Sequence, residues 1–199
     1  MVANTPDKCA FACHDLSTTA NYYSLAKSLG VTMRIDVVRT ATQQLMDTAT
    51  ATASYANQFR AAVYTFGDSA QTLGLRTIAP LTSNLSSVKT QSSAVDLMTV
   101  PYQNYNADQD TNLTDVLKDV NSAMSTPGDG SAASKPQKVL FFVSDGVADY
   151  SKSGTRTIEP ITLASCTEIK NRGIKIAVLY TTYLPLPTND FYNNNVSPF

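Results

Sequence analysis

The chain has 199 residues, of which 43% are hydrophobic and 16% are charged, and its net charge is -1. This length and hydrophobic content are typical of one globular domain with a sizeable core, and the near-neutral charge excludes the basic surface that binds nucleic acid. No stretch reaches the roughly 18 apolar residues of a transmembrane helix, and the first residues lack the charged and apolar regions of a signal peptide, so any export signal is expected outside this sequence.

The first part of the chain is predicted to be irregular as far as Gly30. Apolar residues then recur at helical spacing over residues 35–49, which predicts an amphipathic helix. Two short apolar stretches, residues 59–66 and 70–75, are predicted to be strands joined as a hairpin. Residues 84–98 are predicted to be helical in part.

The second part of the chain alternates helices and strands. The predicted elements are a helix, a linker, a strand, a loop, a helix and a strand, over residues 111–124, 127–131, 139–144, 151–160, 161–172 and 174–180. Thr111 or Asn112 is expected to cap the first helix, and Gly173 to end the second. This alternation predicts an α/β fold with a doubly wound, mostly parallel sheet flanked by helices, and the early hairpin predicts one antiparallel edge strand.

The most informative segment is the apolar run that starts after Lys138 and ends at Asp145 and Gly146. A continuous run of this kind predicts a strand that is buried on both faces. Ligand sites of open α/β sheets lie at the C-terminal ends of their strands, so Asp145 is a candidate metal-binding carboxylate. The alternative is that Asp145 only closes a turn.

Three cysteines, Cys9, Cys13 and Cys166, leave an odd thiol in any disulfide scheme. In an exported protein we expect a local disulfide between Cys9 and Cys13, or cross-links that involve Cys166, and the alternative is three free thiols. Three residues separate Cys9 from Cys13, whereas the c-type haem motif has two. Cys9, Cys13, His14 and Cys166 also form the smallest set that could bind zinc.

Six segments carry a family resemblance: CAFACH at residues 9–14, LGVTMRIDVV at 29–38, DTNLT at 110–114, KVLFFVSDGV at 138–147, KNRGIKIAVLY at 170–180 and YLPLP at 183–187. Together they resemble a von Willebrand factor A domain. More specifically, the first and last segments are similar to the A-type domain of TadG-like (TadE/TadG) proteins of bacterial Flp, or tight-adherence, pilus assembly.

This resemblance implies a metal-ion-dependent adhesion site that holds a divalent cation, usually Mg²⁺, between three loops. By the match of motifs, the second loop supplies Thr111 and the third loop supplies Asp145. Hydroxyl and carboxylate oxygens are the ligands that a hard cation prefers, and an open coordination position would accept a carboxylate of a partner protein. Tyr102, Tyr105 and Tyr150 are expected near the rim of this site, where they could contact that partner.

The sequence departs from the family in its first metal loop. In the family an Asp-x-Ser-x-Ser motif ends a strand that precedes the CAFACH segment, and no such strand is present here. Asp15 and Ser17 form the alternative first loop. We therefore expect residues 1–30 to be an irregular, Cys-containing insertion and residues 31–199 to be an incomplete A-type domain, cut at both ends. Because the missing strand would be central, the isolated chain is expected to be poorly stable or oligomeric.

The resemblance implies a non-enzymatic, protein-binding module of a pilus-assembly or adhesion-related protein. Its partner would be a protein ligand or a pilus component, on the periplasmic or extracellular side of a bacterial envelope, with an upstream membrane anchor in the parent protein. The single His, without a readable acidic partner, predicts no catalytic triad. The alternatives are a metal-dependent hydrolase that uses Asp145 with Asp68 or Asp110, and a structural subunit with a degenerate site.

Overall fold

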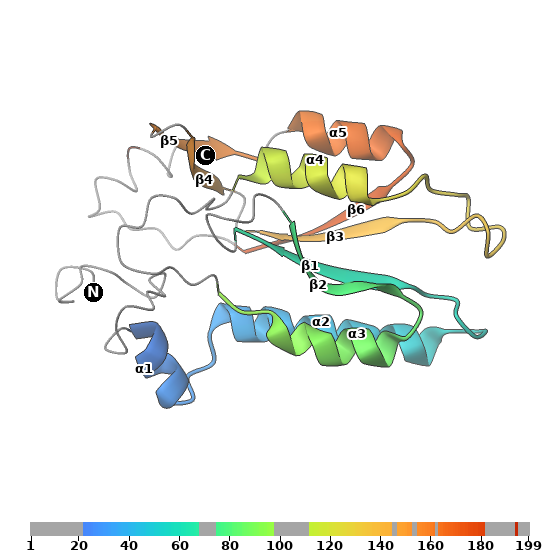
Figure 1. The fold of residues 1–199 in the computed structure, drawn as a ribbon, viewed down its shortest axis with the longest axis horizontal. Helices are drawn as coiled ribbons and strands as arrows, with labels where there is room; N and C mark the ends of the chain where they lie inside the picture. The colour runs from blue at the N-terminus through green and yellow to red at the C-terminus, as the bar shows by residue number, and fades with distance from the viewer. Residues whose placement is uncertain are drawn as a thin grey trace. The chain divides into compact units, whose positions relative to one another are not determined.

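The structure is a computed structural model that describes residues 22–67, 75–97, 112–144, 147–152, 155–161, 163–181 and 194 (Figure 1). The chain divides into two compact units, Met1–Asp108 and Gln109–Phe199.

The first unit contains a helix-covered β-hairpin. Its elements in chain order are α1 (Tyr22–Ser28), α2 (Arg34–Thr52), β1 (Ala61–Phe66), β2 (Leu75–Thr82), α3 (Leu85–Gln91) and the 3-10 helix η2 (Ser92–Ala94). Helices α2 and α3 lie side by side along the hairpin (Figure 1). Met46, Ala79 and Val88, one residue each from α2, β2 and α3, are buried together and form the core. The predicted helix after Gly30 is thereby confirmed as α2.

Strands β1 and β2 are antiparallel, as the sequence predicted, but the second strand is placed differently. It runs from Leu75, opposite Phe66, to Thr82, opposite Ala61, whereas the sequence placed it over residues 70–75. The strand was misplaced because of Pro80: proline lacks the N–H that a β-ladder uses, so its presence argues against a strand. The register of the hairpin shifts around this position, which is where a strand tolerates proline. Residues 68–74 lie outside the described residues.

Helix α1 lies in a segment that the sequence predicted to be irregular. The helix ends in a Schellman motif, in which the N–H of Gly30 donates to the carbonyl of Lys27 at 3.1 Å and the N–H of Val31 donates to that of Ala26 at 2.9 Å. Gly30 has the positive φ, 67°, that this motif requires. The stop signal was therefore present in the sequence, although the short helix before it has no long apolar periodicity.

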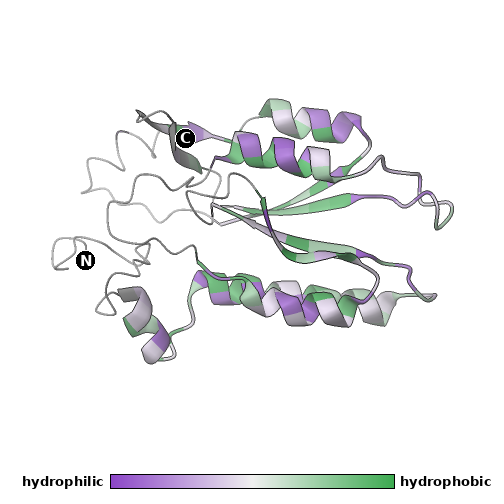
Figure 2. Ribbon diagram, in the orientation of Figure 1, coloured by the Kyte–Doolittle hydropathy of each residue, from purple (hydrophilic) through white to green (hydrophobic). Residues whose placement is uncertain are grey.

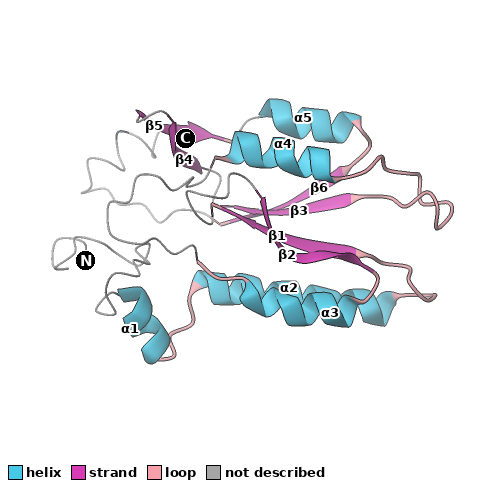
Figure 3. Cartoon of the chain, viewed as in Figure 1, coloured by secondary structure: helices cyan, strands magenta, loops and turns pink. Residues whose placement is uncertain are grey.

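The second unit contains a parallel strand pair, a hairpin and two helices (Figure 3). Its elements are α4 (Leu113–Ala123), β3 (Val139–Ser144), β4 (Val147–Lys152), β5 (Thr155–Pro160), α5 (Leu163–Asn171) and β6 (Lys175–Tyr180). Strands β3 and β6 pair in parallel register from Val139 opposite Lys175 to Ser144 opposite Tyr180. With its parallel pair, its antiparallel pairs and its helices, the chain has the predicted α/β class. Among the described residues the strands form three two-stranded sheets.

Helix α4 supplies more of the described core of the second unit than any other element. Its apolar stripe is buried along its whole length, at Leu113, Val116, Leu117 and Val120. Ile169 and Ile174, which flank the Schellman motif at the end of α5, are also buried. Gly173 has φ of 84° at this C-terminus, so the predicted helix stop is confirmed.

Strand β3 is hydrophobic along most of its length (Figure 2), but the prediction that it is buried on both faces is wrong. Phe142 is 5% exposed, whereas its neighbour Phe141 is 61% exposed and Val139 is also exposed. Successive side chains of a strand point to opposite faces, so only the face of Phe142 is covered. The continuous apolar run therefore predicted the strand correctly, but it did not predict that one face of the strand is exposed.

Candidate metal centre at the end of strand β3

The two predicted metal ligands, Thr111 and Asp145, lie outside the described residues, each next to a described element. Thr111 directly precedes Asn112, the N-cap of α4, and Asp145 directly follows Ser144, the last residue of β3. What the structure shows of the candidate site is therefore the N-terminal end of α4 and the C-terminal end of β3, which flank these two residues.

The N-terminus of α4 is fixed by its own cap. The Asn112 side chain accepts a hydrogen bond from the N–H of Asp115 at 3.1 Å, and its amide nitrogen donates to the Asp115 carboxylate at 2.8 Å. This pair satisfies one of the free N–H groups of the first turn and places a carboxylate at the positive end of the helix dipole. The sequence offered Thr111 or Asn112 as the cap, and the structure selects Asn112.

The C-terminal ends of β3 and β6 are held together. Ser144 stands opposite Tyr180 in the parallel register, and the carbonyl of Ser144 accepts a hydrogen bond from the N–H of Thr181 at 3.1 Å. Figure 1 shows the C-terminal end of β3 and the N-terminal end of α4 at the same end of the second unit. The residues that flank Thr111 and Asp145 thus come from the same end of this unit.

A hairpin that the sequence predicted as a loop lies beside this end. Strands β4 and β5 pair antiparallel from Val147 opposite Pro160 to Lys152 opposite Thr155. Val147 and Ala148 are buried, so the chain that leaves the candidate site enters the core again within three residues of Ser144. The prediction was wrong because the alternation of apolar and polar residues in these strands is weak. The Ser153-Gly154 pair, which separates the two strands in the sequence, was the usable signal.

Tyr150 on β4 is the one predicted rim tyrosine within the described residues. Its hydroxyl donates a hydrogen bond to the carboxylate of Glu159 on β5 at 3.1 Å. Burial, this hydrogen bond and the negative charges of Glu159 and Asp115 raise the pKa of Tyr150. Asp115 belongs to the first turn of α4, and Figure 1 shows that end of α4 and the hairpin at the same end of the second unit. The sequence did not single out Asp115 or Glu159.

The described residues supply neighbours for a metal site but no complete ligand set. Within the described ranges, no group of three or more His, Cys, Asp or Glu side chains is placed to hold a metal ion. Asp115 is engaged by Asn112 and, at 3.7 Å, by Lys118. Thr111 and Asp145, the ligands that the sequence predicted, lie outside the described residues, so their assignment stays a prediction.

Of the other residues that the sequence singled out, some are described by the structure and some are not. Cys166 on α5 is a half-buried free thiol, so it takes no part in a disulfide here. The remaining candidates for metal, haem, disulfide or partner contacts lie outside the described residues: Cys9, Cys13, His14, Asp15, Ser17, Asp68, Tyr102, Tyr105 and Asp110. Over the described ranges, none of the helices combines the length and the apolar character that crossing a membrane takes.

No known protein-family model matches this sequence, and no curated protein matches it either. Among solved structures, the fold is similar to the crystal structure of the conserved hypothetical protein BatB from Bacteroides thetaiotaomicron. The two chains share 12% sequence identity with a TM-score of 0.36, over 75% of this chain and 81% of that one. A likeness of this extent assigns neither a family nor an activity to the chain.

Proposed function

We propose that this chain is a non-enzymatic protein-binding module of the von Willebrand factor A type, from a TadG-like pilus-assembly or adhesion-related protein of the bacterial envelope. One observation carries the proposal. The C-terminal end of β3 and the N-terminal end of α4 lie at the same end of the second unit (Figure 1). The two residues that the family resemblance assigns to metal binding, Thr111 and Asp145, directly adjoin these ends.

The proposed site follows from the chemistry of those two residues. A threonine hydroxyl and an aspartate carboxylate are hard oxygen ligands of the kind that Mg²⁺ takes, with water at the remaining positions. A positively charged ion at an exposed sheet end would bind a carboxylate of a partner protein in one of those positions. The module would then recognise an acidic side chain on a protein ligand or pilus component, on the outer side of the cell membrane.

The first test is a calorimetric titration of the 199-residue chain with MgCl₂, together with two variants. Asp145→Asn removes the proposed ligand charge. Asp129→Asn is the matched control, because Asp129 lies in the loop that precedes β3 and accepts hydrogen bonds from Ser131. Because the expected first metal loop is absent from this chain, we expect weak but saturable Mg²⁺ binding by the unsubstituted chain and by Asp129→Asn, and none by Asp145→Asn.

Two results would contradict this proposal. If the unsubstituted 199-residue chain binds no Mg²⁺, the proposed site does not exist. If Asp145→Asn binds Mg²⁺ as well as the unsubstituted chain does, the ion binds at another site. The hydrolase alternative is tested with a phosphoesterase substrate in the presence of Mg²⁺ or Mn²⁺. Turnover by the parent that is lost in Asp145→Ala would establish an enzyme and overturn the non-enzymatic function.

A further inference from the structure

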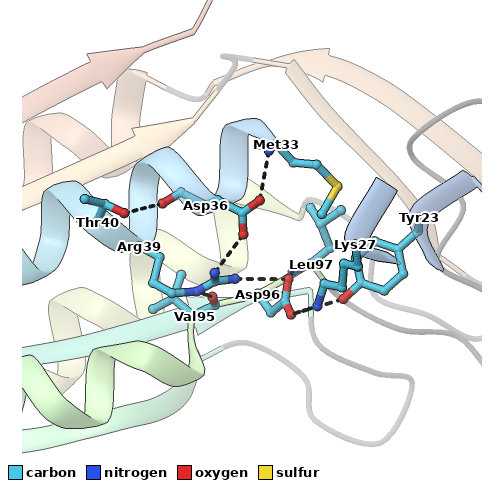
Figure 4. Close-up of polar contacts among 9 residues, drawn as sticks. All are labelled: Tyr23, Lys27, Met33, Asp36, Arg39, Thr40, Val95, Asp96 and Leu97. Carbon is cyan, nitrogen blue, oxygen red and sulfur yellow. Dashed lines mark hydrogen bonds and ion pairs between the residues drawn. The ribbon is translucent and has the colours of Figure 1, made fainter. Parts of the chain in front are cut away.

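One carboxylate, that of Asp96, connects helix α1 to the rest of the first unit (Figure 4). Its Oδ2 accepts a hydrogen bond from the Tyr23 hydroxyl at 3.1 Å and another from the Lys27 ammonium group. Its Oδ1 accepts from the backbone N–H of Leu97 at 2.9 Å. Tyr23 and Lys27 lie one turn apart on α1, with the ammonium nitrogen 4.5 Å from the ring centre, so both face the same acceptor.

Helix α2 reaches the same carboxylate through Arg39. One guanidinium nitrogen of Arg39 lies 3.3 Å from Asp96 Oδ1. The Nε of Arg39 donates to the carbonyl of Val95 at 2.6 Å. A further nitrogen donates to Asp36 at 2.7 Å, and Asp36 in turn accepts from the N–H of Met33 at 2.8 Å. Asp96 therefore lies between one cation on α1 and another on α2.

Apolar contacts hold α1 only weakly. Ala26 is the buried hydrophobic residue of this helix among the described side chains, while Leu25 is exposed and Leu29 is 69% exposed. A helix of seven residues is far shorter than the length at which isolated helices persist in water. Among the described residues, the contacts that tie α1 to the rest of the first unit are therefore largely the polar ones to Asp96.

The connection from α1 to α2 lets one helix move without the other. Gly30 ends α1 with a positive φ, and no atom lies within 4 Å of the position that a Cβ on this residue would occupy. Residues 31–33 then lead to α2 without regular structure. Helix α2 has its own N-terminal contact from Asp36, which does not depend on α1.

We propose that α1 is a charge-operated latch: the Asp96 carboxylate holds it closed, and loss of that charge releases and unfolds α1 while α2, α3 and the β1–β2 hairpin stay folded.

The charges around Asp96 set the direction of the pH dependence. Burial raises the pKa of Asp96, but the hydrogen bonds from Lys27, from the N–H of Leu97 and from Tyr23 outweigh it and lower the pKa below its ordinary value. The latch is thus fully closed above the pKa of an unfolded aspartate, about 4. It opens as the pH falls through the lowered pKa. The groups that face Asp96 are Tyr23 and Lys27 from α1 and Arg39 and Asp36 from α2.

A pH titration alone would not test Asp96 separately. The pKa of Asp36 is lowered as well, by the hydrogen bond from the Met33 N–H and the contact with Arg39, so both carboxylates would change charge in acid. A variant at neutral pH removes the charge of Asp96 alone. The experiment is hydrogen–deuterium exchange of the full chain at neutral pH, for the parent, Asp96→Asn and Asp47→Asn. Asp47 is the matched control, since it forms an exposed ion pair with Lys89 at 2.8 Å elsewhere in the same unit.

We expect the amides of Leu29, Gly30 and Val31 to exchange at least about tenfold faster in Asp96→Asn, while Asp47→Asn matches the parent. The double variant Tyr23→Phe/Lys27→Met cuts only the α1 side of the cluster and should open the latch as well. Protected α1 amides in Asp96→Asn or in the double variant would overturn the proposal. So would an equal loss of protection in α2 and the hairpin, because Asp96 would then stabilise the whole unit.

Discussion

At the scale of single residues, Arg172 is the side chain that joins the two helices of the second unit. It lies at the end of α5, and its guanidinium group donates to the backbone carbonyl and side-chain oxygen of Asn121 and, at 2.5 Å, to the carbonyl of Met124. These acceptors belong to the last turn of α4, whose carbonyls have no partners within the helix. One cation thus caps one helix from the end of another.

We predict that Arg172→Met destabilises the protein by about 2 kcal/mol, because half-buried carbonyls lose a charged donor. The measurement is urea-induced unfolding followed by circular dichroism. Lys170→Met is the control, since it removes a positive charge from an exposed position on the same helix. An equal loss of stability in the two variants would show that net charge, and not the cap, is responsible.

At the scale of elements, glycine ends two of the described helices, α1 and α5. Gly30 and Gly173 both end helices in Schellman motifs with positive φ. In the second motif the N–H of Gly173 donates to the carbonyl of Lys170 at 2.8 Å, and Ile174 follows it into the core. The turn therefore directs the chain from α5 into β6.

Gly173→Ala is predicted to destabilise the protein by about 1 to 2 kcal/mol, the cost of a left-handed conformation at an L-residue. Crowding does not contribute, because the nearest atom to an added Cβ is Pro127 Cγ at 3.7 Å. Asn tolerates this conformation better, so Gly173→Asn should recover part of the loss in the same urea measurement. If Asn were as costly as Ala, backbone conformation would not be the cause.

The elements that the sequence predicted well are those in which a long pattern coincides with a clear boundary. Helix α4 combines an apolar stripe with the cap Asn112, and α5 combines its pattern with Gly173. The elements that were missed or displaced have short or interrupted patterns. Helix α1 contains a single leucine, Leu25, β2 contains Pro80, and the β4–β5 hairpin is largely polar.

At the scale of the whole molecule, each compact unit has its own apolar centre. Met46, Ala79 and Val88 form that of the first unit, and α4 dominates that of the second. The division after Asp108 falls in the stretch 102–110, whose Tyr, Asn and Asp residues indicate a loop, but nothing in the sequence marked that loop as a boundary between two compact units. The candidate site could be predicted in part: the apolar strand that ends at Ser144 made Asp145 a candidate ligand, whereas Thr111 was proposed as a ligand only from the family resemblance.

Leu117→Ala is predicted to destabilise the second unit by about 3 kcal/mol, since it leaves a cavity in the buried face of α4. Leu163→Ala is the matched control, because Leu163 is 78% exposed at the start of α5 and should change stability little. Thermal unfolding of both variants checks the pair. A mild effect of Leu117→Ala would mean that the core of this unit lies elsewhere.

Helix α2 carries a row of threonines, and their hydroxyl groups are turned inward along the helix. Thr40, Thr42, Thr48, Thr50 and Thr52 each donate to the carbonyl four residues earlier. A hydroxyl proton that is bonded in this way satisfies a carbonyl of its own helix and makes no bond to another element. The polar character that these threonines give to the printed sequence is therefore spent within α2 and does not attach this helix to its neighbours.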